Sequence, residues 1–127
     1  MQSKYKYLIG NEWRESKDVL EVRNPYNNEI VSTTFLATER DVNDAIQAAV
    51  HAFEETRRLP SYKRAEILGN IGDGIQKRSE EFARTIALEA GKPIIDARSE
   101  VERAIGTFRI AAEESKRMLG EYIPLDI

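Results

Sequence analysis

Proline and glycine divide the second two-thirds of the chain into helical runs. From Thr38 onward, apolar residues recur at the three- and four-residue spacing that is typical of amphipathic helices. Pro60 interrupts this spacing once, and Gly91-Lys92-Pro93 interrupts it again. Proline cannot continue a helix, and glycine readily takes the left-handed conformation that ends one. The sequence therefore predicts three long helices, over residues 38–59, 61–90 and 93–119.

Each predicted helix carries one apolar stripe. Thr38 is a good N-cap for the first, with Asp41 three residues on, and Pro93 begins the third. The stripes are Val42, Ala45, Ile46, Ala49 and Phe53; Leu68, Ile71, Ile75, Phe82 and Ile86; and Ile94, Ala97, Val101, Ala104, Ile105, Phe108 and Ala111. They predict helices that bury one face each.

The first 37 residues read as strands and turns instead. Gly10-Asn11 is a turn signal between short apolar runs, and residues 24–28 (NPYNN) form a second turn signal. β-branched and aromatic residues follow this turn at 30–35. We therefore expect a β-hairpin region over 1–37 and, from the tail EYIPLDI, the start of a strand over 120–127. Residues 1–127 are expected to form a single domain portion, mainly α with N-terminal β-hairpins.

Composition excludes several classes of protein. The formal net charge is −3, with acids and bases mixed along the chain, which does not favour nucleic-acid binding. No apolar run is long enough for a membrane span, and the first residues lack the apolar core of a signal peptide, so we expect a cytoplasmic protein. The sequence contains no cysteine, which excludes disulfides, thiolate metal sites and a cysteine nucleophile among these residues.

Local motifs suggest candidate sites, but each has a structural explanation. GNIGDGIQKR (Gly69 to Arg78) resembles a phosphate loop only superficially, because Ile75 follows the last glycine and Lys77 comes too late. We interpret these glycines as positions of close helix packing. His51 is the only histidine and lies one step off the apolar face. A solvated or half-buried helix histidine is the favoured interpretation.

The acidic residues and the Gly-Lys-Pro motif also have structural explanations. Spacing cannot separate a catalytic pair from a solvated helix face among Glu80, Glu81, Glu89, Glu100 and Glu102. Arg98–Glu102 and Glu113–Arg117 are expected to be i, i+4 ion pairs. The chemistry of Gly91-Lys92-Pro93 is fully explained by a helix stop followed by a helix start. An anion site at Lys92 is the alternative.

Several motifs in order resemble the N-terminal part of the aldehyde dehydrogenase superfamily. They are YLIGNEW, VRNPYNNEIV, AIQAAVHAFEETRRLPSYKRAEIL and LEAGKPIIDARSEVERAIGTFRIAAEE. The details NPYNNEIV and AGKPIIDARSEVERAIGTF are most similar to the branch of lactaldehyde and non-phosphorylating glyceraldehyde-3-phosphate dehydrogenases. The resemblance implies an α/β fold with a Rossmann-type cofactor domain, of which 1–127 is the N-terminal portion. It also implies an enzyme that assembles as a homo-oligomer.

The resemblance implies oxidation of a small aldehyde to a carboxylic acid with NAD or NADP. In the family a cysteine thiolate attacks the carbonyl, hydride passes to nicotinamide, and a glutamate-activated water cleaves the thioester. The cysteine is absent here, and the family's other working residues match no position of this sequence. We therefore assign no catalytic, cofactor-binding or metal-binding residue, although Val22 and Glu102 match segments near a cation site in some members. The chain is expected to be an N-terminal fragment, inactive by itself.

The resemblance also predicts incomplete burial. Without the sheet that later residues of the family supply, the stripes through Ile46, Ile71, Phe82 and Phe108 lose part of their cover, and the isolated chain is expected to self-associate or to be marginally stable. The alternative hypothesis is a self-contained helical interaction module without enzymatic activity.

Overall fold

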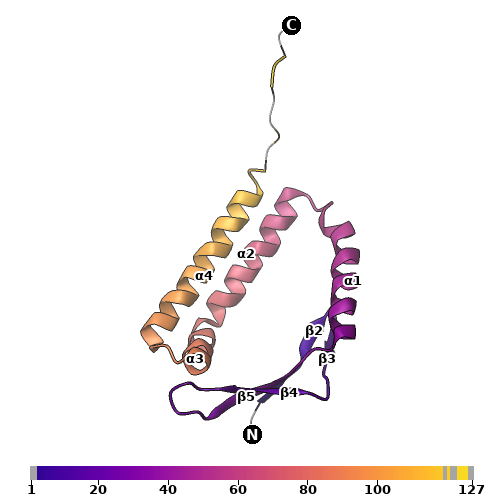
Figure 1. Ribbon diagram of the computed structural model, residues 1–127. Helices are drawn as coiled ribbons and strands as arrows, with labels where there is room; N and C mark the ends of the chain where they lie inside the picture. Colours follow the sequence, from indigo (N-terminus) through magenta and orange to yellow (C-terminus); the bar gives the residue numbers. More distant parts are fainter. Residues whose placement is uncertain (1–2, 119, 121–122, 126–127) are drawn as a thin grey trace.

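The structure is a computed structural model that describes residues 3–118, 120 and 123–125. Its elements within these residues are, in chain order, β1 (Ser3–Tyr5), β2 (Tyr7–Ile9), β3 (Glu12–Arg14), β4 (Val19–Arg23), β5 (Ile30–Phe35), α1 (Glu39–Thr56), α2 (Ser61–Lys77), α3 (Ser79–Ala90) and α4 (Ile94–Ser115). The helices α2 and α4 lie side by side, α3 joins them near the strands, and α1 diverges from this pair (Figure 1). The mainly α composition and the N-terminal hairpins are confirmed.

The first hairpin forms at the predicted turn. β2 and β3 pair antiparallel with Ile9 opposite Glu12, which leaves Gly10 and Asn11 as a two-residue connection. Gly10 has a φ of 58°, in the left-handed region that glycine adopts without a steric penalty. The local turn chemistry therefore sets the register of this hairpin.

The second hairpin belongs to a three-stranded sheet with the order β1-β5-β4. β4 and β5 pair antiparallel across the turn at 24–28, where the Asn24 side chain accepts a hydrogen bond from the Tyr26 N–H at 2.9 Å. β1 pairs parallel to β5, with Ser3 opposite Ser32. This parallel pairing was not predicted, because nothing in the local pattern of residues 3–5 indicates a partner thirty residues away.

The helix predicted over 38–59 is α1, and it begins as expected. The Thr38 hydroxyl accepts the Asp41 N–H, and the Asp41 carboxylate accepts the Thr38 N–H, which together make a capping box. The helix ends at Thr56 rather than at residue 59. The Arg58 and Leu59 N–H groups bond to carbonyls three residues back, so the last predicted turn is tightened out of α-helical geometry.

The helix predicted over 61–90 is wrong in one respect, because the chain forms two helices there. α2 ends at Lys77, Arg78 takes a non-helical conformation with φ −114° and ψ 21°, and α3 begins at Ser79. The break lets α3 turn so that Ala83 packs against α4, where it is fully buried. Glu80 and Glu81 then occupy the first turn of α3, where acids suit the helix dipole.

The core lies where α3 and α4 meet. Ala83, Ala97 and Val101 are buried together, and partly buried residues surround them: Ile75, Ile86, Ala87, Ile94 and Ile105. Small side chains at the centre let the helices approach closely, so the three consecutive helices α2, α3 and α4 form one packed unit, which we call the helical layer. No helix within the described residues is long and apolar enough to span a bilayer.

The third predicted helix, 93–119, is α4 and is shorter at both ends. Pro93 is its N-cap rather than its first residue, and the helix ends at Ser115, after which Lys116 and Arg117 bond three residues back. Residue 119 lies outside the described residues. Of the predicted strand over 120–127, the described residues 120 and 123–125 have no regular secondary structure, and the rest lie outside the description. The strand stays a prediction.

Candidate functional site

The Gly91-Lys92-Pro93 joint packs on the turn between β4 and β5. Gly91 ends α3 in the left-handed conformation, with a φ of 65°. A Cβ atom at this position would lie 2.7 Å from Cγ of Pro25, which is too close for two non-bonded carbon atoms. Gly91 is therefore required both by its own backbone and by the proline ring against it. The interpretation of this motif as a helix stop and start is confirmed.

Lys92 has a partner within the chain. Its ammonium group donates to the carboxylate of Glu100 in α4. This hydrogen bond lowers the pKa of Glu100 below its ordinary value. The pairing neutralises the lysine, so the alternative of an anion site at Lys92 gains no support from its geometry.

The glycine-rich stretch at 69–78 lies within α2 and its C-cap, so its backbone does not form a phosphate-binding loop. Gly72 is buried against α4, where an added Cβ would lie 3.5 Å from Cβ of Phe108. An added Cβ at Gly69 or Gly74 would meet nothing within 4 Å. Close helix packing is thus confirmed for Gly72 and is wrong for the other two glycines.

Three of the five acidic candidates, Glu80, Glu81 and Glu100, are engaged in ion pairs. Glu80 accepts two hydrogen bonds from Arg98 of α4, at 2.9 and 3.0 Å, and one from Arg84. The hydrogen bonds from Arg98, followed by the bond from Arg84, lower the pKa of Glu80 to about 2. The expected Arg98–Glu102 pair is wrong, because Arg98 directs its Nε and Nη2 donors to Glu80 in a longer-range bidentate pair.

Glu81 and two acids near the end of α4 also form ion pairs. Glu81 pairs with Arg78 at 2.5 Å, and that hydrogen bond lowers its pKa. The expected Glu113–Arg117 pair is wrong as well: Lys116 bonds to Glu113 at 2.8 Å, and Arg117 lies 3.2 Å from Glu114. A carboxylate held ionised by a neighbouring cation is poorly placed to act as a general acid near neutral pH.

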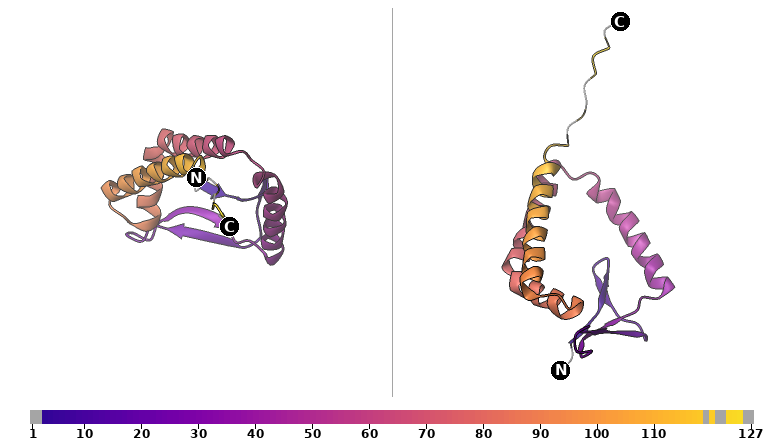
Figure 2. Two further views of the ribbon diagram at one scale, coloured as in Figure 1. Left: turned by 90° about the horizontal axis from the view of Figure 1, so that it is seen from above. Right: turned by 60° about the vertical axis from the view of Figure 1, so that its left-hand side comes forward.

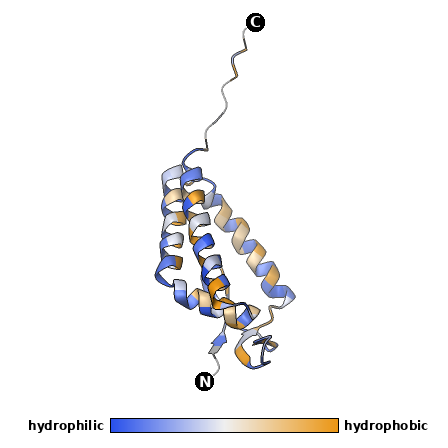
Figure 3. Ribbon diagram, turned by 90° about the vertical axis from the view of Figure 1, so that its left-hand side faces the viewer, coloured by the Kyte–Doolittle hydropathy of each residue, from blue (hydrophilic) through white to orange (hydrophobic). Residues whose placement is uncertain are grey.

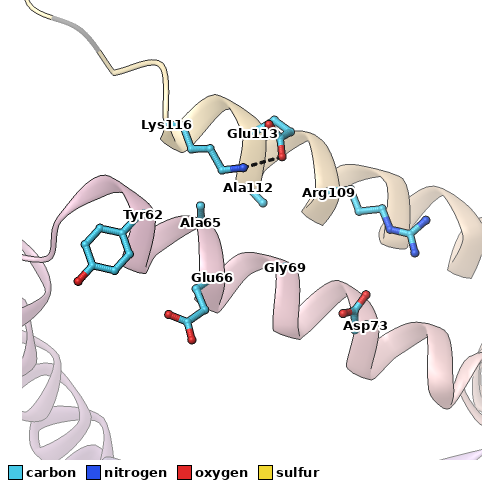
Figure 4. A pocket seen from close by; sticks show the side chains of 9 residues that line it. All are labelled: Tyr62, Ala65, Glu66, Gly69, Asp73, Arg109, Ala112, Glu113 and Lys116. Carbon is cyan, nitrogen blue, oxygen red and sulfur yellow. Dashed lines mark hydrogen bonds and ion pairs between the residues drawn. The ribbon is translucent and has the colours of Figure 1, made fainter.

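A shallow groove of about 530 Å³ runs between α2 and α4 (Figure 4). Ala65 and Ala112 are buried at its floor, and charged side chains stand along its rim. Lys116 reaches Glu113 across one helical turn, and Glu66 is paired outside the groove with Lys63 at 2.7 Å. Its lining includes no histidine, serine or threonine. The groove is the seam between two packed helices, and two of its acids, Glu66 and Glu113, are paired with lysines at the surface.

The other sequence candidates lie apart from one another. His51 is exposed on α1, Val22 lies in β4, and Glu102 lies in α4. Within the described residues, no three His, Cys, Asp or Glu side chains come together in a group that could hold a metal ion. The structure therefore brings none of these candidates into a shared site.

A polar cluster that sequence reasoning missed fixes the first hairpin to α1. The Tyr7 hydroxyl donates to the Asp41 carboxylate at 2.8 Å, and Arg14 donates to Asp44 at 2.6 Å. Hydrogen bonds from the Thr38 hydroxyl and N–H, and then from Tyr7, lower the pKa of Asp41 to about 2. The capping signal at Thr38 was visible in the sequence, but nothing local indicated that Tyr7 and Arg14 would reach this helix.

Comparison with known proteins then decides the family. The model of the aldehyde dehydrogenase family matches residues 13–126. The chain belongs to the aldehyde dehydrogenase family. The N-terminal resemblance seen in the sequence, including its similarity to lactaldehyde dehydrogenases, is confirmed.

Relatives from the family cover nearly all of the chain. A lactaldehyde dehydrogenase of Methanocaldococcus jannaschii is 40% identical over 119 residues, which are 94% of this chain and 26% of that protein. A 3-sulfolactaldehyde dehydrogenase of Priestia aryabhattai is 38% identical over 122 residues, which are 96% of this chain and 25% of the relative. The chain thus spans about a quarter of the length of the curated relatives it matches.

Solved aldehyde dehydrogenase structures contain the same arrangement. Aldehyde dehydrogenase 21 of Physcomitrella patens, solved with the reaction product succinate, is 41% identical, with a TM-score of 0.94 over 100% of this chain and 27% of its own. Betaine aldehyde dehydrogenase of Staphylococcus aureus, solved with NAD+, is 30% identical, with a TM-score of 0.90 over 99% of this chain and 26% of its own. The observed elements are therefore the family's own fold in this segment.

Proposed function

We propose that the chain serves as the N-terminal structural segment of an NAD(P)-dependent aldehyde dehydrogenase that oxidises a small aldehyde to a carboxylic acid. The observation that carries the proposal is the structural match to aldehyde dehydrogenase 21. The match covers 100% of this chain but only 27% of the aldehyde dehydrogenase 21 chain. A segment that keeps its fold inside a chain nearly four times as long has a role in that larger structure.

The described residues contribute scaffolding rather than chemistry to this enzyme. They do not fit a dinucleotide: the glycine-rich stretch is helical, and Lys92 is paired with Glu100. The chain also has no cysteine to serve as the thiolate nucleophile. We assign no step of the reaction to these 127 residues. The choice between NAD and NADP, the particular aldehyde, the homo-oligomeric assembly and the cytoplasmic location stay predictions.

A chimeric enzyme tests the proposal. The 127-residue chain would replace the matching segment of the Methanocaldococcus jannaschii lactaldehyde dehydrogenase, and reduction of NAD and of NADP would be followed at 340 nm with lactaldehyde. We expect turnover from the chimera and none from the 127-residue chain alone. The relative with its matching segment deleted is the control.

Two results would contradict the proposal. Turnover by the isolated chain would show that the missing thiolate is not required. A chimera that folds and assembles like the parent relative but has no activity would favour the alternative of a helical interaction module. Assembly is measured separately by size-exclusion chromatography with light scattering, so misfolding is distinguished from lost function.

A further inference from the structure

Glycines lie at the same level of the two long helices of the helical layer. Gly69 and Gly74 are in α2, Gly106 is in α4, and we call these three residues the glycine line. Gly72 shows that the levels match, because a Cβ atom added there would lie 3.8 Å from the carbonyl oxygen of Ile105, the residue before Gly106. The two helices lie side by side in Figure 1 and in both views of Figure 2. The glycine line therefore crosses the layer from one helix to the other.

Neither space nor backbone conformation requires glycine at these three positions. An added Cβ at Gly69, Gly74 or Gly106 would meet nothing within 4 Å. Their backbones are also outside the left-handed region, which Gly10 and Gly91 adopt. The α2 pair does not form a packing stripe, since Gly74 is about 140° around the helix axis from Gly69. Glycine inside a helix lowers its stability relative to alanine, so these positions weaken the helices without improving their packing.

The glycine line separates two halves of the layer that are packed differently. On one side, Ala83, Ala97 and Val101 form the buried core between α3 and α4. On the other side, Ala65 and Ala112 form the floor of the groove between α2 and α4. Hydrophilic and hydrophobic residues alternate along the helices in Figure 3, so both halves present polar side chains to water. The half with the groove has space beside its helices into which they can move.

An exposed hydrogen bond crosses the glycine line. The Arg109 guanidinium donates to the side-chain oxygen of Gln76. Arg109 follows Gly106 on the groove side of the line, whereas Gln76 follows Gly74 on the core side. Bending at the line therefore stretches this bond. A single exposed hydrogen bond contributes little net stability, so it can break and form again as the helices bend.

We propose that the glycine line is a hinge of the helical layer, at which the half with the groove bends relative to the half with the core. Helices kink where glycine leaves the backbone unrestrained, and hinge residues absorb the change in φ and ψ. Two packed helices can bend together without separating only if both are weak at the same level. Gly69 and Gly74 supply this weakness in α2, and Gly106 supplies it in α4.

Hydrogen exchange of single amides in the 127-residue chain, followed by NMR, tests the hinge. We expect amides 70–76 of α2 and 104–110 of α4, the hinge amides, to exchange at rates that do not change up to about 1 M urea, because bending exposes little new surface. Exchange of the amides next to Val101 should accelerate with urea over the same range, because the core opens only when the layer unfolds.

Alanine substitutions in the glycine line should slow exchange at the hinge amides. Gly106→Ala is expected to slow it about fivefold, and Gly69→Ala combined with Gly74→Ala about 25-fold, because alanine favours the closed helix. Either change should slow exchange in both helices, since the helices bend together. Ser99→Ala is the matched control, because Ser99 is exposed in α4 two turns before Gly106 and also becomes a better helix former. We expect Ser99→Ala to leave the hinge amides unchanged.

A distance measurement tests the hinge independently of exchange. The chain contains no cysteine, so Lys63→Cys with Lys77→Cys introduces its only two thiols. Both positions are exposed, about 21 Å apart along α2, with the α2 glycines between them. The distribution of distances between spin labels on these thiols should narrow when Gly69→Ala and Gly74→Ala are added.

Four results would overturn the hinge. Hinge amides with the urea dependence of Val101 would mean that the layer opens only as a whole. Slower exchange confined to the substituted helix would mean that α2 and α4 do not bend together. Equal slowing by Ser99→Ala would mean that the glycine line has no special role. A distance distribution of unchanged width would mean that α2 does not bend between its two labels.

Discussion

The helical layer and α1 are built from similar amphipathic sequences but reach different degrees of burial. In the helical layer, Ala83 and Ala97 are completely buried and Val101 is 4% exposed. On α1, the corresponding stripe residues Val42 and Ile46 are about half exposed. Periodicity alone thus tells which face of a helix is meant to be covered, but not whether the covering element lies in the same stretch of chain.

The largest expected difference between the two regions comes from placing a charge on each stripe. Val101→Asp puts a carboxylate into the α3–α4 core, which we expect to lower the free energy of unfolding by more than about 3 kcal/mol. Val42→Asp changes a half-exposed position and should alter it by less than about 0.5 kcal/mol. Urea unfolding of the 127-residue chain, followed by circular dichroism, measures both. Equal losses would mean that α1 already has a cover.

A smaller effect is expected at the joint between α3 and α4. Gly91→Ala places a Cβ in the left-handed conformation and against the Pro25 ring, which should cost about 1–3 kcal/mol. Combining it with Pro25→Ala removes the clash, so the double variant should lose less than the sum of the single variants. Gly74→Ala, where the space is open, is the control and should stabilise the chain by about 1 kcal/mol. Strictly additive losses at Gly91 and Pro25 would contradict the contact.

The smallest effect concerns pH. The pKa of Asp41 is about 2 in the folded chain and 3.8 ordinarily, so the unfolded chain binds more protons between these values. The stability that Asp41 provides is fully present above about pH 5 and is lost as the pH falls towards 2. Asp41→Asn should therefore reduce the drop in urea midpoint between pH 5 and pH 3.

Glu80→Gln provides the comparison on the helical layer, since the pKa of Glu80 is also about 2. We expect it to reduce the same pH dependence by a similar small amount, because both carboxylates are hydrogen-bonded near the surface. An unchanged drop in both variants would show that neither carboxylate has its pKa lowered by folding.

Local sequence chemistry predicted the elements whose signals are local. Gly10 marked the first hairpin turn, Thr38 marked the start of α1, and Gly91 with Pro93 marked the joint between α3 and α4. The apolar spacing does not indicate the break at Arg78, because it continues from Ile75 to Phe82 across it. The two acids after Ser79 are a local signal of a new helix start, because acidic side chains favour the first turn of a helix.

Long-range features could not be predicted in this way. The parallel pairing of β1 with β5, the reach of Arg98 to Glu80 and the attachment of Tyr7 to Asp41 all depend on how distant segments meet in space. Local chemistry favours a structural role for each candidate site, and the order of several motifs indicates the family. Neither step depends on a single diagnostic residue.

The contact between Pro25 and Gly91 has a consequence for recombination within the family. The turn at Pro25 and the joint at Gly91 are sixty-six positions apart in sequence but in direct contact. They must therefore be inherited together to remain compatible. Shuffled genes whose crossover falls between them would combine a proline turn from one parent with a helix joint from another. Crossovers before residue 25 or after residue 91 keep the pair intact and are the breakpoints at which exchanged sequences should survive.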